Sequence, residues 1–175
     1  LAFLEIMTET GINTFLIQED VNFKKYLDTA WVVSIVRGIF ISLFLLIIAK
    51  PVSIFFASPE SVGVLALVSL EAFLRGFINP AIVSFQKELE FNKEFYLRFT
   101  IFLIDSTISI ALALILKSAY SIVLGMLFAA ILEILLSFIV IRPLPKLRLN
   151  LNYIKRVVRR GRWINAIGLF NYLFQ

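Results

Sequence analysis

Four long apolar stretches set the pattern of the chain, at about residues 31–49, 62–82, 95–116 and 119–141. Each is close to the roughly 20 mostly apolar residues that a helix needs to cross a bilayer. Pro51 and Pro59 mark the connection between the first two stretches as a break. Asn79-Pro80 falls at the end of its stretch, where proline disrupts a helix little. The pattern predicts an all-α, multi-pass transmembrane bundle.

Two shorter apolar segments lie near the ends, at residues 1–17 and from about residue 163 onward. The first residue is Leu1 rather than Met, and the last segment reaches only about two thirds of the length of a span. No signal peptide with a basic start and a small-residue cleavage site is visible. We expect the chain to be an internal piece of a longer membrane protein.

The connections differ in their content of lysine and arginine, and this difference predicts the orientation. The first, third and fifth connections hold thirteen basic residues, whereas the second and fourth hold only Lys50 and Lys117. Basic loops are retained on the cytoplasmic side of a membrane. Trp31 and Trp163 then fall at the cytoplasmic interface, where indole rings are enriched.

The fifth connection, residues 142–162, is longer than the others and strongly basic. Pro143 and Pro145 oppose a helix at its start. From Asn152 onward, apolar and basic residues occupy different sides of a short predicted helix, which Gly161 can cap. We expect this helix to lie on the membrane surface and to bind anionic lipid headgroups through Lys155, Arg156, Arg159 and Arg160. It can act as a topological anchor, as a tether between two bundles, or as both.

Ionisable residues lie inside the predicted spans, although a charge at membrane depth costs roughly 2.5–3.5 kcal/mol on insertion scales. The seven are Glu5, Glu9, Arg37, Glu71, Arg75, Asp105 and Glu133. Counted from the cytoplasmic end of each helix, all lie roughly 10–18 Å deep. Small polar residues extend the same helix faces at intervals of three or four positions. We therefore predict a bundle whose polar sides face a common, hydrated interior.

Packing alone can explain part of this pattern. Glu71 and Arg75 can form a self-satisfied i,i+4 pair, and isolated serine or glycine residues suit close helix packing. Five carboxylates against two arginines leave an acidic surplus, so some carboxylates must be protonated, bind a cation or face water. We hypothesise that H⁺ or Na⁺ is exchanged during transport by one or more of Glu5, Glu9, Asp105 and Glu133.

The composition excludes several other classes of function. The chain is 60% hydrophobic, against about 45–50% for soluble domains. It has no cysteine and no histidine, which removes thiol nucleophiles and imidazole or thiolate metal sites. Nucleotide-binding motifs are missing, and the basic tract is flanked by membrane helices, so nucleic acid is a poor partner. We expect no cofactor, no metal and no enzymatic activity.

Five stretches follow one another in a recognisable order: FLEIMTETGINTFLIQ, LDTAW, IFFASPE, RGFINPAIVSFQKELEFNKEF and RRGRW. In this order they resemble the polysaccharide-flippase branch of the multidrug/oligosaccharidyl-lipid/polysaccharide exporter superfamily. This branch comprises the Wzx-type O-antigen, capsule and teichoic-acid exporters. The segment RGFINPAIVSFQKELEF is the most specific, and the likeness covers essentially the whole chain.

The resemblance implies two bundles of six or more helices around a central cavity. Residues 1–141 would run from the second half of helix 2 to helix 6 of the first bundle. Residues 142–162 would link the bundles in the cytoplasm, and 163–175 would start helix 7. The implied substrate is an undecaprenyl-pyrophosphate-linked oligosaccharide, moved by alternating access across the cytoplasmic membrane of a bacterium.

Cavity-lining basic residues of this family are thought to meet the pyrophosphate, and Arg37 and Arg75 are the intramembrane candidates. With Glu71 and Asn79, which share a helix face with Arg75, they form the predicted substrate-binding set. A guanidinium offers a fixed fork of donors to phosphate oxygens and stays charged at any depth.

Other functions stay open at this point. A cation-coupled drug antiporter of the same superfamily would suit the acidic surplus. A membrane-embedded transferase is disfavoured because the outer loops are short, histidine and cysteine are missing, and no paired-carboxylate motif is exposed. A purely structural subunit would leave the layer of charge at one depth unexplained.

Overall fold

The computed structural model describes residues 13, 16–17 and 23–148, and the regular elements in this part of the chain are all helices. The predicted all-α fold class is confirmed. The long helices are α3 (Phe23–Phe55), α4 (Ser61–Arg75), α6 (Phe91–Leu116) and α7 (Tyr120–Val140). Between α4 and α6 lie the 3₁₀ helix η1 (Pro80–Val83) and the short α5 (Ser84–Lys87). Several predictions lie outside the described residues: those for Glu5 and Glu9, for the surface helix after Asn152 with its lipid-binding residues Lys155, Arg156, Arg159 and Arg160, and for residues 163–175, including Trp163.

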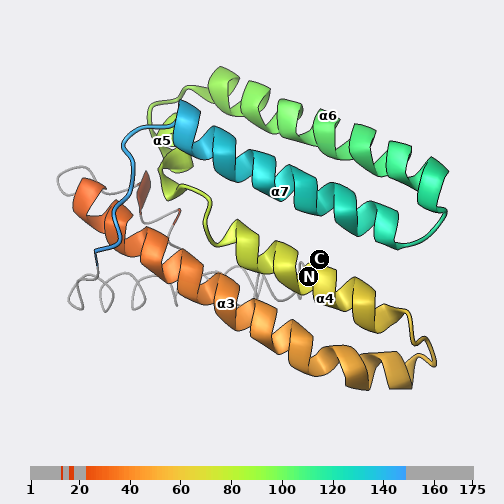
Figure 1. The fold of residues 1–175 in the computed structure, drawn as a ribbon. Helices are drawn as coiled ribbons and strands as arrows, with labels where there is room; N and C mark the ends of the chain where they lie inside the picture. The colour runs from red at the N-terminus through yellow and green to blue at the C-terminus, as the bar shows by residue number, and fades with distance from the viewer. Residues whose placement is uncertain (1–12, 14–15, 18–22, 149–175) are drawn as a thin grey trace, which may run out of the picture.

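The long helices lie in a single row, and helices that follow one another along the chain run in opposite directions, so the packed neighbours α4 and α7 run parallel (Figure 1). Helix α3 packs on α4, α4 packs on α7, and α7 packs on α6. One end of the long helices brings together the beginnings of α3 and α6, the end of α7 and the α5 segment. The described residues of the basic connections therefore lie together at that end, opposite the connections that carry Lys50 and Lys117. This arrangement reproduces the alternation that the loop charges predict.

Three of these helices are long and apolar enough to cross a membrane: α3, α6 and α7. Their surfaces expose large apolar side chains, including Ile47 on α3, Leu114 on α6 and Ile139 on α7, each at least 70% exposed. Such faces are unfavourable in water but match the hydrocarbon core of a bilayer. The chain is a membrane protein.

Helix α3 is longer than predicted at both ends. It starts at Phe23 rather than Trp31 and continues through Pro51 to Phe55. At its start, Tyr26, Leu27 and Ala30 are buried, so packing extends the helix into the polar connection. Pro51 lies close to the end of the helix, where only the bond to the carbonyl group of Ile47 is lost. The prediction that Pro51 belongs to a break was wrong; the break lies between Phe55 and Ser61.

The second predicted span, 62–82, is interrupted. Helix α4 ends at Arg75, and the chain turns by 66° before η1 and α5 continue it. Asn79 is extended, with φ −66° and ψ 113°, as expected for a residue before proline. Pro80 then occupies the start of η1, where its missing N–H is not needed. The prediction that Pro80 disrupts this span little was wrong. Helix α4 has already ended at Arg75, and Asn79 caps a new helical segment that begins at Pro80.

The backbone of this break is satisfied by side chains from neighbouring helices. The indole nitrogen of Trp31 on α3 donates to the Phe77 carbonyl oxygen at 3.1 Å. The backbone N–H of Asn79 donates to Ser137 Oγ on α7 at 3.1 Å. Because unpaired backbone groups are costly at membrane depth, a break there requires such partners. Trp31 thus contributes to the fold through its indole nitrogen, a role that its predicted interface position does not suggest.

The segment after α7 is held against the same end of the row. Its first residue, Ile141, is buried in an apolar cluster with Tyr26, Val83 and Leu97. The backbone N–H of Lys146 donates to Asp28 Oδ1 on α3 at 2.8 Å. Residues 141–146 are therefore fixed to the helices that they follow.

Candidate functional site

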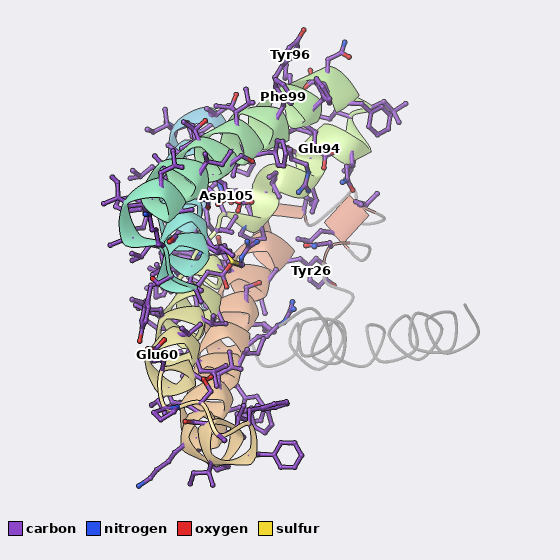
Figure 2. All side chains as sticks on the ribbon, turned by 90° about the vertical axis from the view of Figure 1, so that its right-hand side faces the viewer. Tyr26, Glu60, Glu94, Tyr96, Phe99 and Asp105 are labelled. Atoms are coloured by element: carbon purple, nitrogen blue, oxygen red, sulfur yellow. The ribbon has the colours of Figure 1, made fainter. Side chains whose placement is uncertain are left out.

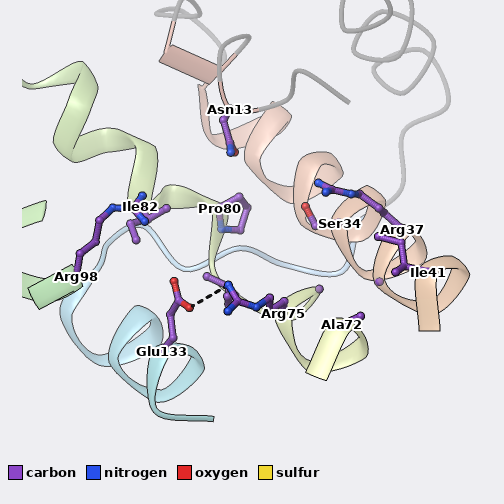
Figure 3. A pocket seen from close by; sticks show the side chains of 13 residues that line it. Asn13, Ser34, Arg37, Ile41, Ala72, Arg75, Pro80, Ile82, Arg98 and Glu133 are labelled. Carbon is purple, nitrogen blue, oxygen red and sulfur yellow. Dashed lines mark ion pairs between the residues drawn. The ribbon is translucent and has the colours of Figure 1, made fainter. Parts of the chain in front are cut away.

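A cavity of about 270 Å³ lies between the helices near the break in α4 (Figure 3). Three arginines line it, each from a different helix: Arg37 of α3, Arg75 of α4 and Arg98 of α6. Glu133 of α7 also lines it. Ser34 and Asn13 add further polar groups to the wall. The predicted polar interior therefore exists in the described part of the chain, and arginine dominates its charge.

Close contact between α3 and α4 forms one wall of the cavity. A Cβ atom at Gly76 would lie 2.9 Å from the Ser34 carbonyl oxygen. A Cβ atom at Gly38 would lie 3.0 Å from the Ala72 carbonyl oxygen. Small residues allow two helix backbones to approach in this way. Gly38 therefore serves close packing between α3 and α4, as expected for an isolated glycine in these helices.

Arg75 lies between two carboxylates. Its Nε atom pairs with Glu71 Oε1 one turn earlier on α4, and its Nη1 atom is 4.0 Å from Glu133 Oε2 on α7 (Figure 3). The Glu71 side chain is fully buried and the Glu133 side chain is 15% exposed, whereas that of Arg75 is 41% exposed. The predicted i,i+4 pair is present. It holds the guanidinium in place while leaving part of Arg75 open to the cavity.

Arg98 also lines the cavity, although the predicted substrate-binding set did not include it. Helix α6 starts at Phe91, so Arg98 lies two turns inside it. Its Nε atom donates to Glu94 Oε1 at 2.8 Å. The spacing of seven residues between Arg98 and Asp105 was the available signal, because it places both residues near one face of the helix.

Asn79 is directed into the protein. Its side-chain oxygen accepts from the backbone N–H of Ala81 at 2.9 Å, and its side-chain nitrogen lies 3.3 Å from the Ser137 carbonyl oxygen and 3.5 Å from that of Pro143. The residue is fully buried and does not line the cavity. These contacts connect the break, α7 and the following segment. The structure thus assigns Asn79 a clear packing role, and its substrate contact stays a prediction.

Asp105 also lies outside the cavity wall. Its Oδ1 atom accepts from Ser109 Oγ on the same helix at 3.2 Å. Ser109 packs against α7 at Gly125, where an added Cβ atom would lie 1.8 Å from Ser109 Oγ. Asp105 therefore lies near the contact between α6 and α7 (labelled in Figure 2). Its role in ion coupling stays a prediction.

The charge balance of the described cavity differs from the sequence count. Three arginines and one glutamate line it, because Arg98 joins the wall and Glu71 lies buried beside Arg75. No cluster of three or more carboxylates suited to a metal ion occurs among the residues that the structure describes. The arrangement can attract an anion and fix the orientation of its negatively charged oxygens.

One of the comparisons with known proteins finds a match. A family model described as polysaccharide biosynthesis protein matches residues 1–175, the whole chain. No curated protein and no solved structure matches the chain.

Proposed function

Because this chain belongs to the polysaccharide biosynthesis protein family, we propose that it forms part of a flippase for lipid-linked oligosaccharides. The substrate would be an undecaprenyl-pyrophosphate-linked repeat unit, and movement would be by alternating access across the cytoplasmic membrane of a bacterium. The observation that supports this proposal best is the cavity in which arginines from three separate helices meet. The chain is not proposed to be an enzyme.

Arginine suits the pyrophosphate of such a substrate. Its guanidinium presents parallel donors that match two phosphate oxygens, and it remains charged where a lysine could lose its proton. Arg37 and Arg75 lie on adjacent helices at the same cavity. A pyrophosphate bound there would have its charge offset by residues from α3 and α4 at once. The sugar would occupy the polar space while the polyprenyl chain stays in lipid.

The carboxylates would set the strength of anion binding. Glu71 and Glu133 flank Arg75, so an incoming phosphate would compete with Glu133 for the Nη1 side of the guanidinium. Binding that can be reversed is required of a transporter, because the substrate must leave on the other side. We propose that protonation of Glu133 is one route by which H⁺ modulates this competition.

Ion coupling by Glu5, Glu9 and Asp105 is kept as a proposal, with Na⁺ as the second possible ion. Transport by the full-length protein should lose its dependence on both ion gradients when these three residues and Glu133 are neutralised together. A dependence that persists unchanged in this variant contradicts the coupling proposal. Neutralising Glu133 alone separates its contribution from that of the other three.

The surroundings of the cavity complete the proposed arrangement. Residues 1–141 would belong to the first bundle, 142–162 to the cytoplasmic link and 163–175 to the start of the second bundle. Anionic lipid headgroups would bind the link at Lys155, Arg156, Arg159 and Arg160. A drug or organic-cation antiporter is not favoured, because the three arginines of the described cavity would repel a cationic substrate.

The experiment is a translocation assay with the full-length protein in vesicles that contain a labelled lipid-linked oligosaccharide. Removing Arg75 alone would leave Glu71 buried without it, so the variant Glu71→Gln/Arg75→Gln is compared with Glu71→Gln. We expect the double variant to lose most translocation while inserting normally, and the single variant to keep it. Equal translocation rates for the two variants would mean that Arg75 only contributes to packing. Absence of any translocation by the wild-type protein would contradict the proposed function itself.

A further inference from the structure

A second hollow, of about 390 Å³, lies on the outer surface of α6. Six residues of this one helix line it, at intervals of three or four positions: Phe91, Glu94, Phe95, Arg98, Phe99 and Phe102. This spacing places them along a single stripe of the helix. We call these six residues the α6 stripe. Figure 2 shows Glu94 and Phe99 at the end of the molecule where α6 begins.

The apolar part of the α6 stripe is exposed. Its four phenylalanines range from 45% exposed at Phe99 to 61% at Phe95 and Phe102. The rings of Phe95 and Phe99 stack with their centroids 5.6 Å apart. Exposed phenylalanine is ordinary on a lipid-facing helix, so the rings alone do not indicate a binding site. The charged pair among them is the unusual feature.

Arg98 joins the α6 stripe to the arginine-lined cavity, because it lines both hollows. Figure 3 shows its side chain extending from α6 toward Ile82 in the cavity wall. Its Nε atom is bonded to Glu94, whose Oε1 atom also accepts from Gln86 Nε2 at 2.8 Å. Within the described residues, no acceptor is bonded to the two terminal nitrogens of Arg98. These nitrogens stand between an apolar surface and a polar cavity.

The dimensions of the α6 stripe match one leaflet of a membrane. Phe91 and Phe102 are eleven residues apart, which is about 16 Å along a helix. The hydrocarbon core of a bilayer is about 30 Å thick, so one leaflet contributes about half of that. Arg98 lies seven residues after Phe91 and four residues before Phe102, about 10 Å and 6 Å along the helix. An apolar chain whose phosphate contacts Arg98 could therefore pack on Phe99 and Phe102 toward the middle of the membrane.

We propose that the α6 stripe is the docking surface for the isoprenoid chain of the substrate, with its pyrophosphate bound at Arg98 before it enters the cavity. This inference rests on the proposed function, because it takes the substrate to be lipid-linked. Charge complementarity carries the assignment: a phosphate bound by the guanidinium of Arg98 would place the start of its apolar chain beside Phe99 and Phe102, which line the same hollow. Glu94 and Gln86 hold the guanidinium there and leave its outer nitrogens for phosphate.

The test uses photo-crosslinking in the full-length protein. A benzophenone side chain is introduced at Phe99, and a matched control carries it at Phe128, which is 52% exposed on α7 and outside the α6 stripe. The probe is a radiolabelled polyprenyl pyrophosphate in vesicles of phosphatidylethanolamine and phosphatidylglycerol. We expect strong labelling at position 99, weak labelling at position 128, and a loss of about tenfold at position 99 on adding Arg98→Gln.

A second arm distinguishes this ligand from ordinary membrane lipid. Unlabelled polyprenyl pyrophosphate should compete for labelling at position 99, whereas extra phosphatidylglycerol should not. Equal labelling at the two positions, or equal competition by phosphatidylglycerol, would overturn the proposal and make the α6 stripe a general lipid-facing surface. If wild-type protein translocates lipid-linked oligosaccharide but position 99 is not labelled, the docking surface fails and the proposed function stands. If position 99 is labelled but the wild-type protein translocates no lipid-linked oligosaccharide, the docking surface stands and the proposed function fails.

Discussion

The two sides of the break after Arg75 differ in how their polar groups are satisfied. Before the break, Arg75 is held by carboxylates, and 41% of its side chain remains exposed. After it, Asn79 is fully buried, and both polar atoms of its side chain contact the protein. Arg75 and Asn79 share one stripe of the sequence, but only Arg75 keeps a surface that another molecule can reach. Polar residues at membrane depth therefore mark either a site or a fold constraint, and their contacts distinguish the two.

The largest expected effect is on stability, from Asn79→Leu. This change removes the acceptor for the Ala81 N–H and the donor to Ser137, so buried backbone groups lose their partners. We expect a loss of roughly 2–4 kcal/mol in the free energy of unfolding. Thermal unfolding of the purified full-length protein measures it. A stable variant that fails only in transport would show that Asn79 contacts substrate, as the sequence predicted.

Gly76→Ala should have the next largest effect. Its Cβ atom would lie 2.9 Å from the backbone oxygen of Ser34, which cannot move without shifting α3. We expect a destabilisation of roughly 1–3 kcal/mol from overpacking. Gly125→Ala is the matched control, since its close neighbour is the hydroxyl group of the Ser109 side chain. Combining Gly125→Ala with Ser109→Ala should recover part of the lost stability, because it removes the 1.8 Å contact but leaves the Cβ atom of residue 109 at 3.0 Å. No comparable rescue should exist for Gly76→Ala.

Asp28→Ala tests the attachment of the segment after α7. It removes the acceptor for the Lys146 backbone N–H, so we expect a cost of about 1 kcal/mol and faster exchange of the amide hydrogen of Lys146. Asp28→Asn keeps an acceptor oxygen and should behave nearly like the wild type. Unchanged exchange in Asp28→Ala would mean that Asp28 does not hold this segment.

Glu133→Gln should have the smallest effect on stability. The Glu133–Arg75 contact is 4.0 Å long and involves a partly exposed arginine, so we expect a change below about 1 kcal/mol. Its effect should instead appear as altered proton dependence of transport in vesicles with an imposed pH gradient. A large loss of stability with normal proton dependence of transport would mean that Glu133, like Asn79, stabilises the fold and does not couple transport to protons.

The sequence predicted the helical class, the antiparallel order and the ends of α6 and α7 well, because long apolar stretches and loop charges determine them. It misplaced the ends of α3 and α4. Pro51 and Pro80 look alike as helix breakers, yet only Pro80 follows a residue that can cap a new helix. The backbone before Pro80 also finds partners, because Trp31 on α3 donates to the Phe77 carbonyl oxygen and Ser137 on α7 accepts from the Asn79 N–H. Those partners come from distant parts of the chain, so local patterns could not reveal them.

The candidate site was predictable in part for the same reason. Helix periodicity identified Arg37, Arg75 and Glu133, which all line the cavity. It could not separate Asn79 from Arg75, because residues one turn apart share a face until the helix bends. Arg98 was not in the predicted substrate-binding set, although the apolar stretch at 95–116 contains it and it lies seven residues before Asp105.

The most direct test of this comparison is the translocation rate per folded molecule, measured for Glu71→Gln/Arg75→Gln and for Asn79→Ser. The account predicts that the arginine variant folds in normal amounts but translocates little. It predicts that Asn79→Ser yields less folded protein, with a normal rate for each folded molecule. The opposite pattern, with a normal rate in the arginine variant and a low rate in well-folded Asn79→Ser, would contradict it.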